Sequence, residues 1–435
     1  MSMIRKSFGA LLGNAMQFYD FTIYAFLTPY ISKEFFNFES PFISYLMVFG
    51  VFASGYLSRP LGSLLFGYIG DKKGRSYALS KTIIISTVAT FTMGVIPGYD
   101  KIGVYAPLFL VILRLIQGVA VSGEEGGAVV LLFEKFSFKD QGVIGGTVLS
   151  SVLAGVVLGT IICVITDLLI DQSILSAWAW RIPFILALPF GAIALVLRFY
   201  LSDFNSFNIA IEKKLILKTP TRVLLSDYPW VIFYGFCIVS IYSITTSTLI
   251  VHLPYYLTRN IGYSHYISLS ILMLAISIIA LLTPWIGKQF NKIDPKIIYQ
   301  LALLGFILLA PLQFYILSFG HFITTACAVF IFTMIISMIS CTVFSILVGI
   351  FPFNVRYSGV SLTFNLAVTI FSSTTPLALI FFENKFNSGL APGIYLSIIS
   401  LLLFSVIHIL NKRLFLPNCY KNDSESFMYP HKPLM

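Results

Sequence analysis

The chain has little charge. Only 11% of its 435 residues are Asp, Glu, Lys or Arg, whereas a soluble domain has about a quarter. Hydrophobic residues make up 57% of the chain, and its mean hydropathy is +0.90. These values exclude a soluble enzyme and indicate a polytopic membrane protein. Twelve spans of about 20 residues each would use roughly half of the chain and leave no room for a soluble domain.

Several chemical signatures are missing as well. No Gly-rich phosphate loop with Lys and Ser/Thr occurs, so nothing indicates that ATP drives the protein. No set of His, Cys and Asp has metal-ligand spacing, and the five cysteines have no paired spacing, which favours free thiols. We therefore expect neither a metal nor an organic cofactor, and any transport would run on an ion gradient or downhill.

The net charge of +10 is placed in a way that argues against nucleic acid as a partner. Most basic residues fall in segments that the predicted topology puts on one side of a bilayer, as the positive-inside rule describes. An even number of spans places both termini on that side. Arg5, Lys6, Lys412 and Arg413 identify it as the cytoplasm.

The longest polar break divides the chain nearly in half. We predict an N-terminal six-helix bundle over 1–201, a cytoplasmic linker over 202–228, a C-terminal six-helix bundle over 229–411 and a cytoplasmic tail over 412–435. The first two spans are expected at about 8–31 and 44–70. Weak echoes between the halves suggest an internal duplication, with chance similarity between apolar sequences as the alternative.

The first span carries polar residues on one helical face. Gly13, Gln17, Asp20 and Tyr24 follow one another at steps of four, three and four, which aligns them. Placing a charge near the bilayer centre costs at least about 2.5–3.5 kcal/mol, so we expect Asp20 to have a functional or structural role that offsets this cost. It could bind a cationic substrate group or carry a proton. The alternative is an internal salt bridge that fixes helix packing.

The fourth span holds Arg114, Gln117, Glu124 and Glu125, whose side chains can all face the protein interior. Arg114 and Glu124 lie about 15 Å apart along the helix, too far to pair. Each needs another partner, and Asp20 is the candidate for Arg114. Adjacent carboxylates in a low dielectric raise each other's proton affinity, which suits a proton carrier. The alternative for Glu125, near the end of the span, is that it faces water.

Two further residues are ambiguous. Arg59, followed by Pro60 in the second span, could pair with an acid or extend its guanidinium toward water, and a structural role is favoured. His252 in the seventh span could titrate near neutral pH. A hydrogen-bonded packing residue is the favoured interpretation of His252.

Segment 67–75 is a Gly-rich polar stretch between two apolar runs, and it predicts a short turn. It resembles the loop between helices two and three of the major facilitator superfamily of transporters. The matching residues, with the neighbouring base, are Gly67, Asp71, Lys72, Gly74 and Arg75. The resemblance implies that the acid and the bases form a cytoplasmic gate. It also implies that Arg114, in a second motif over 114–118, takes part in proton coupling.

Other segments are similar to the metabolite:proton symporters within that superfamily, and nearest to their proline/betaine branch. These segments are 12–21, 59–62, 122–124 and 180–184. Two positions depart from the family pattern: Gln17 stands where the family usually has Glu, and Glu125 where it tends to have an aromatic. Both fall in the expected cavity and leave the substrate open.

The resemblance implies an all-α protein of twelve transmembrane helices in two six-helix bundles, in a bacterial inner membrane. It would import a small polar metabolite with a proton, as a monomer. Asp20, Arg114 and Glu124 would couple the proton, and Gln17, Tyr24, Gln117 and Glu125 would line the pathway. A proline- or betaine-type zwitterion is favoured, because a zwitterion can use both an acid and an Arg. The alternatives are a carboxylate resembling 2-oxoglutarate or citrate, an uncoupled facilitator, and a sensor that does not transport.

Overall fold

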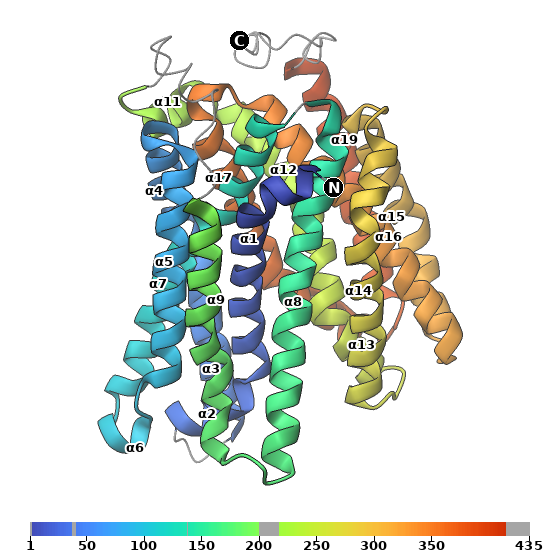
Figure 1. Cartoon of the computed structure of the whole chain (residues 1–435). Coiled ribbons are helices and arrows are strands. Elements are labelled where there is room, and N and C mark those ends of the chain that lie inside the picture. Colours follow the sequence, from blue (N-terminus) through green and yellow to red (C-terminus); the bar gives the residue numbers. More distant parts are fainter. Residues whose placement is uncertain (1, 37–40, 137, 200–216, 415–435) are drawn as a thin grey trace. The chain divides into compact units, whose positions relative to one another are not determined.

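The computed structural model describes residues 2–36, 41–136, 138–199 and 217–414, which are helical and contain no strand (Figure 1). The chain divides into two compact units. Unit 1 comprises Met1–Leu132 and Ser151–Lys218, and unit 2 comprises Phe133–Ser150 and Thr219–Met435. The division passes through two long helices, so residues 133–150 group with unit 2.

Unit 1 is built from the early helices of the chain. They are α1 (Ser2–Phe26), α2 (Thr28–Phe35), α3 (Pro41–Leu57), α4 (Arg59–Lys73), α5 (Arg75–Val95), α6 (Tyr99–Ile102), most of α7 (Tyr105–Lys135), the later part of α8 (Gln141–Asp171) and α9 (Ile182–Phe199). Helix α9 packs along both α5 and α1, as Figure 1 shows. Side chains at the end of α9 can therefore reach α1 and α5.

Unit 2 contains the remaining helices. They are α11 (Pro220–Asp227), α12 (Pro229–Ser247), the π turn η3 (Thr248–His252), α13 (Leu253–Arg259), α14 (His265–Phe290), α15 (Pro295–Leu317), α16 (Phe322–Ile350), α17 (Arg356–Ala367), the π turn η5 (Val368–Ser372), α18 (Ser373–Phe386) and α19 (Ala391–Leu414). Helix α15 packs against α16 and α19, and α12 packs against α17.

Ten helical stretches among the described residues are long and apolar enough to cross a membrane. The first two predicted spans correspond to α1 and to the pair α3 and α4. The break between α3 and α4 falls at Ser58, just before Pro60. Proline has no N–H to donate to the preceding turn, so the helix is interrupted there.

The predicted turn over 67–75 is wrong. Helix α4 continues to Lys73 and α5 begins at Arg75, so Gly74 alone leaves the helical conformation. Its φ of 104° is one that only glycine adopts readily. The glycines of this segment predict a loop because glycine disfavours helices in water, whereas helices packed closely against neighbours accept it.

Close packing accounts for other glycines in unit 1. A Cβ on Gly118 would lie 2.0 Å from the carbonyl oxygen of Gly55, which brings α7 against α3. A Cβ on Gly155 would lie 2.0 Å from the carbonyl oxygen of Ala15, which brings α8 against α1. Small residues of this kind let helix backbones approach one another.

Parts of two predicted segments lie outside the described residues. Of the linker predicted over 202–228, residues 202–216 fall there, and the remainder contains α11. Of the tail predicted over 412–435, residues 415–435 fall there, and α19 extends to Leu414.

Candidate functional site

Charged side chains gather in the interior of unit 1. None of them is more than 4% exposed: Asp20 on α1, Arg59 on α4, Arg114, Glu124 and Glu125 on α7, and Arg198 on α9. Burying a charge is costly unless it is paired or hydrogen-bonded. The partners of these groups therefore show which of them are structural and which are available to a ligand.

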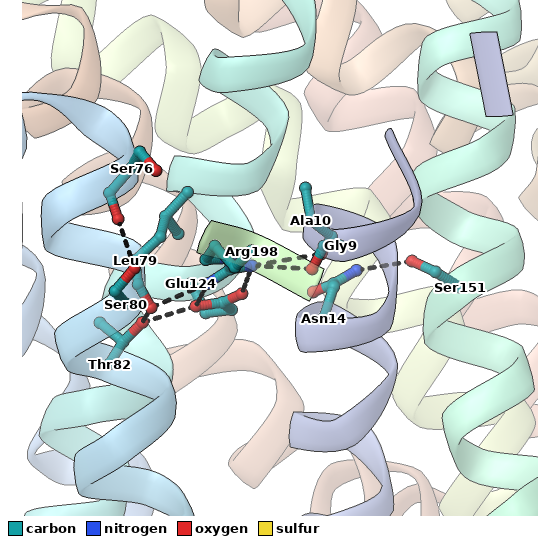
Figure 2. Close-up of polar contacts among 10 residues, drawn as sticks. All are labelled: Gly9, Ala10, Asn14, Ser76, Leu79, Ser80, Thr82, Glu124, Ser151 and Arg198. Atoms are coloured by element: carbon teal, nitrogen blue, oxygen red, sulfur yellow. Dashed lines mark hydrogen bonds and ion pairs between the residues drawn. The ribbon is translucent and has the colours of Figure 1, made fainter. Parts of the chain in front are cut away.

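Glu124 and Arg198 form a fully buried ion pair (Figure 2). Arg198 Nη2 lies 2.5 Å from Glu124 Oε1, and Nη1 lies 3.0 Å from Oε2. Thr82 Oγ1 donates a third hydrogen bond to Oε2, at 2.5 Å. Two parallel N–H bonds from one guanidinium make a strong, directional contact. The Glu124 carboxylate is thus bound by side chains of both α5 and α9.

Sequence reasoning missed Arg198. It sits in the last turn of α9. A base still within the apolar run was the available signal. Gly13 on α1 fits the same pair, because a Cβ there would lie 2.5 Å from Arg198 Nη2 and 2.6 Å from Glu124 Oε1.

Asp20 and Arg114 do not form the expected ion pair among the described residues. Ser86 Oγ donates to Asp20 Oδ2 at 3.0 Å. Arg114 Nη1 donates to the side-chain oxygen Oε1 of Gln117, one turn along the same helix. Gln117 Nε2 in turn donates to Thr90 Oγ1 at 2.8 Å, and Thr90 is also adjacent to Asp20. We call these five residues the Asp20–Arg114 cluster.

Aromatic rings pack against Arg59 and Arg114, which have no ion-pair partner among the described residues. The Arg114 guanidinium carbon lies 3.6 Å from the Tyr24 ring centroid. The Arg59 guanidinium carbon lies 4.5 Å from the centroids of both Phe21 and Tyr56. A cation over an aromatic face is attracted by the ring quadrupole, more strongly when both are desolvated. Tyr24 therefore contributes its ring face to the site, and the chain's own cations already occupy these faces.

Several buried polar atoms on these helices have no hydrogen-bond partner in the described part of the chain. Within the described residues, the buried atoms that lack a hydrogen bond include both amide atoms of Gln17, Asp20 Oδ1, Arg59 Nε, Arg114 Nε and Nη2, and Glu125 Oε1. Such atoms are rare in proteins, because each loses its hydration without compensation. This set combines donors and acceptors, so a small polar ligand could satisfy it. Glu125 does not face water, since it is only 4% exposed.

The residues of the predicted gate lie around Gly74. Asp71 Oδ1 is 3.4 Å from Arg75 Nη2, and both side chains are buried. Arg75 Nη1 also donates to the Gly70 carbonyl oxygen at 2.8 Å. Lys72 instead is exposed and donates to the Tyr68 hydroxyl. The acid and the arginine thus form one buried pair, and the lysine stands apart from it.

No group of three or more His, Cys, Asp or Glu that could hold a metal ion occurs among the described residues.

Comparisons with known proteins add to this geometry. The family description "Major Facilitator Superfamily" matches residues 10–376. The chain is 31% identical, over 411 residues, to a putative proline/betaine transporter of Staphylococcus haemolyticus, covering 93% of this chain and 86% of the relative. It is 30% identical, over 410 residues, to the proline/betaine transporter of Escherichia coli K12, covering 91% and 81%.

Among solved structures, the proton:xylose symporter XylE bound to 6-bromo-6-deoxy-D-glucose is similar, with a TM-score of 0.68 and 16% identity. The match covers 94% of this chain and 95% of that one. It confirms the predicted all-α fold of twelve membrane-spanning helices in two bundles.

Proposed function

Because this chain belongs to the major facilitator superfamily, a family of transporters and not of enzymes, we propose that it imports a small polar metabolite together with a proton. The protein crosses the bilayer several times, so its partners are lipid and a small-molecule substrate. The proposed location is a bacterial inner membrane, by analogy with the relatives. The proposed orientation, with both termini in the cytoplasm, follows the positive-inside rule.

The observation that carries the proposal is the separation of Asp20 from Arg114 by neutral side chains. A carboxylate paired directly with an arginine stays ionised, because the cation favours the charged form. Asp20 instead accepts from Ser86 and keeps Oδ1 without a partner. It is therefore the best-placed group to take up and release a proton, and Arg114 keeps donors for the substrate.

The proposed substrate is a zwitterion of the proline or betaine type. Arg114 Nε and Nη2 have no partner, and two N–H donors of one guanidinium suit a carboxylate. The acids Asp20 and Glu125 each keep one oxygen without a partner for the cationic end. Two similar proteins are named as proline/betaine transporters, which supports the same substrates.

One observation favours the carboxylate alternative. Arg59 and Arg114 both lie over the ring of Phe21, with guanidinium carbons 4.5 and 5.1 Å from its centroid. Both also keep an Nε without a partner. Two cations on one ring could bind the two ends of a dicarboxylate, and they leave less aromatic surface for a quaternary ammonium group.

Glu124 has a different role in this proposal. Its carboxylate accepts three hydrogen bonds and faces a fixed cation, so protonation would break a satisfied ion pair. We assign it to positioning α5, α7 and α9. Glu125, which keeps a free oxygen, is the second acid of the pathway.

The test is competitive uptake into proteoliposomes that contain the purified chain and a trapped pH indicator. Labelled proline would compete with unlabelled glycine betaine, 2-oxoglutarate or citrate. The proposal expects substrate accumulation driven by a proton gradient, acidification of the lumen during uptake, and competition by zwitterions. Uptake without acidification would identify a facilitator, and competition by carboxylates alone would identify the alternative substrate class.

A further inference from the structure

Two long helical stretches of unit 2, α12–α13 and α17–α18, are each interrupted by a π turn, and the two π turns are neighbours in space. The π turn η3 separates α12 from α13, and the π turn η5 separates α17 from α18. The two interruptions lie against each other, because Ser247 Oγ donates to the Ser372 carbonyl oxygen at 2.9 Å. Each π turn carries one extra residue per turn, and such turns often mark functional positions in helices.

Proline weakens the backbone just beyond each interruption. Pro254 is the second residue of α13, and Pro376 lies in the first turn of α18. Neither can donate a backbone hydrogen bond to the preceding turn. The segments α13 and α18 are therefore held less firmly by their own helices, and contacts between their side chains gain importance.

One buried ionisable pair joins η3, the turn that leads into α13, to α18. His252 Nε2, at the end of η3, lies 3.1 Å from Glu383 Oε1 on α18. His252 is 1% exposed and Glu383 is 8% exposed. A second link lies close by, since the Tyr256 hydroxyl donates to the Gly389 carbonyl oxygen at 3.1 Å.

The surroundings of the pair are mostly aromatic. The rings of Tyr255, Tyr256 and Phe314 have centroids 6.1 to 6.5 Å from that of His252. Glu383 is the one carboxylate that contacts His252 in the described structure. Arg259 contacts this surrounding through Tyr255, to whose hydroxyl it donates.

The adjoining cavity is too small for a metabolite. It measures about 10 Å³ and is lined by residues that include Leu253, Gln313 and Phe332. That is room for about one water molecule. The cavity therefore cannot admit the transported molecule.

We propose that His252 and Glu383 form a second protonation site, which latches α13 to α18 while the pair holds its proton. With one proton the pair is an imidazolium beside a carboxylate, neutral overall and hydrogen-bonded. Without it, a buried carboxylate has no countercharge, which is unfavourable in an apolar setting. Raising the pH until the pair loses this proton therefore releases α18 from η3, the turn that leads into α13. The site is independent of the proposed role of Asp20 in unit 1.

Hydrogen–deuterium exchange of the purified full chain tests the latch directly. Exchange in α13 and α18 would be compared at about pH 5.5 and about pH 8, where histidine changes its charge, after correction for the intrinsic pH dependence of amide exchange. We expect protection of both segments to fall roughly tenfold at the higher pH, with α15 unchanged as the internal reference.

Matched variants assign the effect. His252→Gln keeps a side-chain N–H but cannot titrate, so it should abolish the pH dependence, as should Glu383→Gln. His408→Gln, at an exposed position on α19, should retain it. Protection in the wild-type chain that is the same at both pH values overturns the proposal, even if no variant folds. A pH dependence that persists in His252→Gln overturns it as well.

Discussion

Arg198 donates to both carboxylate oxygens of Glu124, with Nη2 2.5 Å from Oε1 and Nη1 3.0 Å from Oε2, and neither side chain has any exposed surface. The pair ties the end of α9 to the middle of α7, and Thr82 adds α5 to the same carboxylate. Three helices of unit 1 thus meet at one ion pair, which makes it a support for the polar groups nearby.

Removing one partner of this pair should destabilise the protein. Glu124→Gln leaves the Arg198 guanidinium buried without a countercharge, which costs about 3–5 kcal/mol in comparable pairs. Thermal unfolding in detergent would show a lowered midpoint and reduced expression. Glu124→Gln combined with Arg198→Gln should recover part of the loss. A stable Glu124→Gln protein that transports without moving protons would instead restore Glu124 as the proton carrier.

Asp20→Asn should uncouple transport from the proton gradient. The amide keeps a similar shape and can still accept from Ser86, but it cannot release a proton. We expect gradient-driven accumulation to be lost while exchange of labelled for unlabelled substrate continues. Asp171→Asn, at an exposed position, is the matched control. Full accumulation by Asp20→Asn would exclude the proposed role.

Arg114→Lys should weaken substrate binding. A lysine keeps the charge but loses the planar fork and the stacking on Tyr24. The apparent affinity for a carboxylate-bearing substrate should fall by roughly 10- to 100-fold, the equivalent of about one charge-assisted hydrogen bond. Uptake at varied substrate concentration measures this change.

Arg59→Lys separates the two substrate classes. A zwitterion has one carboxylate and should depend chiefly on Arg114, so Arg59→Lys should change its affinity little. Equal losses in the two variants would favour a dicarboxylate bound by both arginines.

Asp71→Asn should abolish transport and lower the expression level, because it removes the countercharge that Asp71 gives the buried Arg75 guanidinium. Lys72→Gln removes the adjacent charge from an exposed position and should leave uptake almost unchanged. Uptake rates at matched protein levels decide the outcome. Equal rates in the two variants would reduce this segment to a determinant of topology.

The sequence predicted the fold because long apolar runs have few other solutions in a bilayer. It also placed Asp20, Gln17, Arg114 and Gln117 in the interior, since helical spacing aligns residues on one face. Spacing along one helix does not reveal which residue of another helix lies opposite. That is why Arg198 was missed.

The failed pairing of Asp20 with Arg114 has a local cause. Gln117 lies three residues beyond Arg114, within reach on the same helix face, and it captures the guanidinium. This neighbour was visible in the sequence. A neutral acceptor on the same helix, such as Gln117, can thus bind an arginine in place of an acid on another helix, such as Asp20.

Helix α5 presents three hydroxyls, Thr82, Ser86 and Thr90, spaced four residues apart. They contact Glu124, Asp20 and Gln117 respectively. These three contacts are coupled, because one rigid helix carries all three hydroxyls on the same face. A rotation of α5 about its axis cannot break one contact and spare the others. The rotation angle of α5 therefore determines all three contacts together: the one to Glu124 of the ion pair, the one to Asp20, and the one to Gln117 beside Arg114.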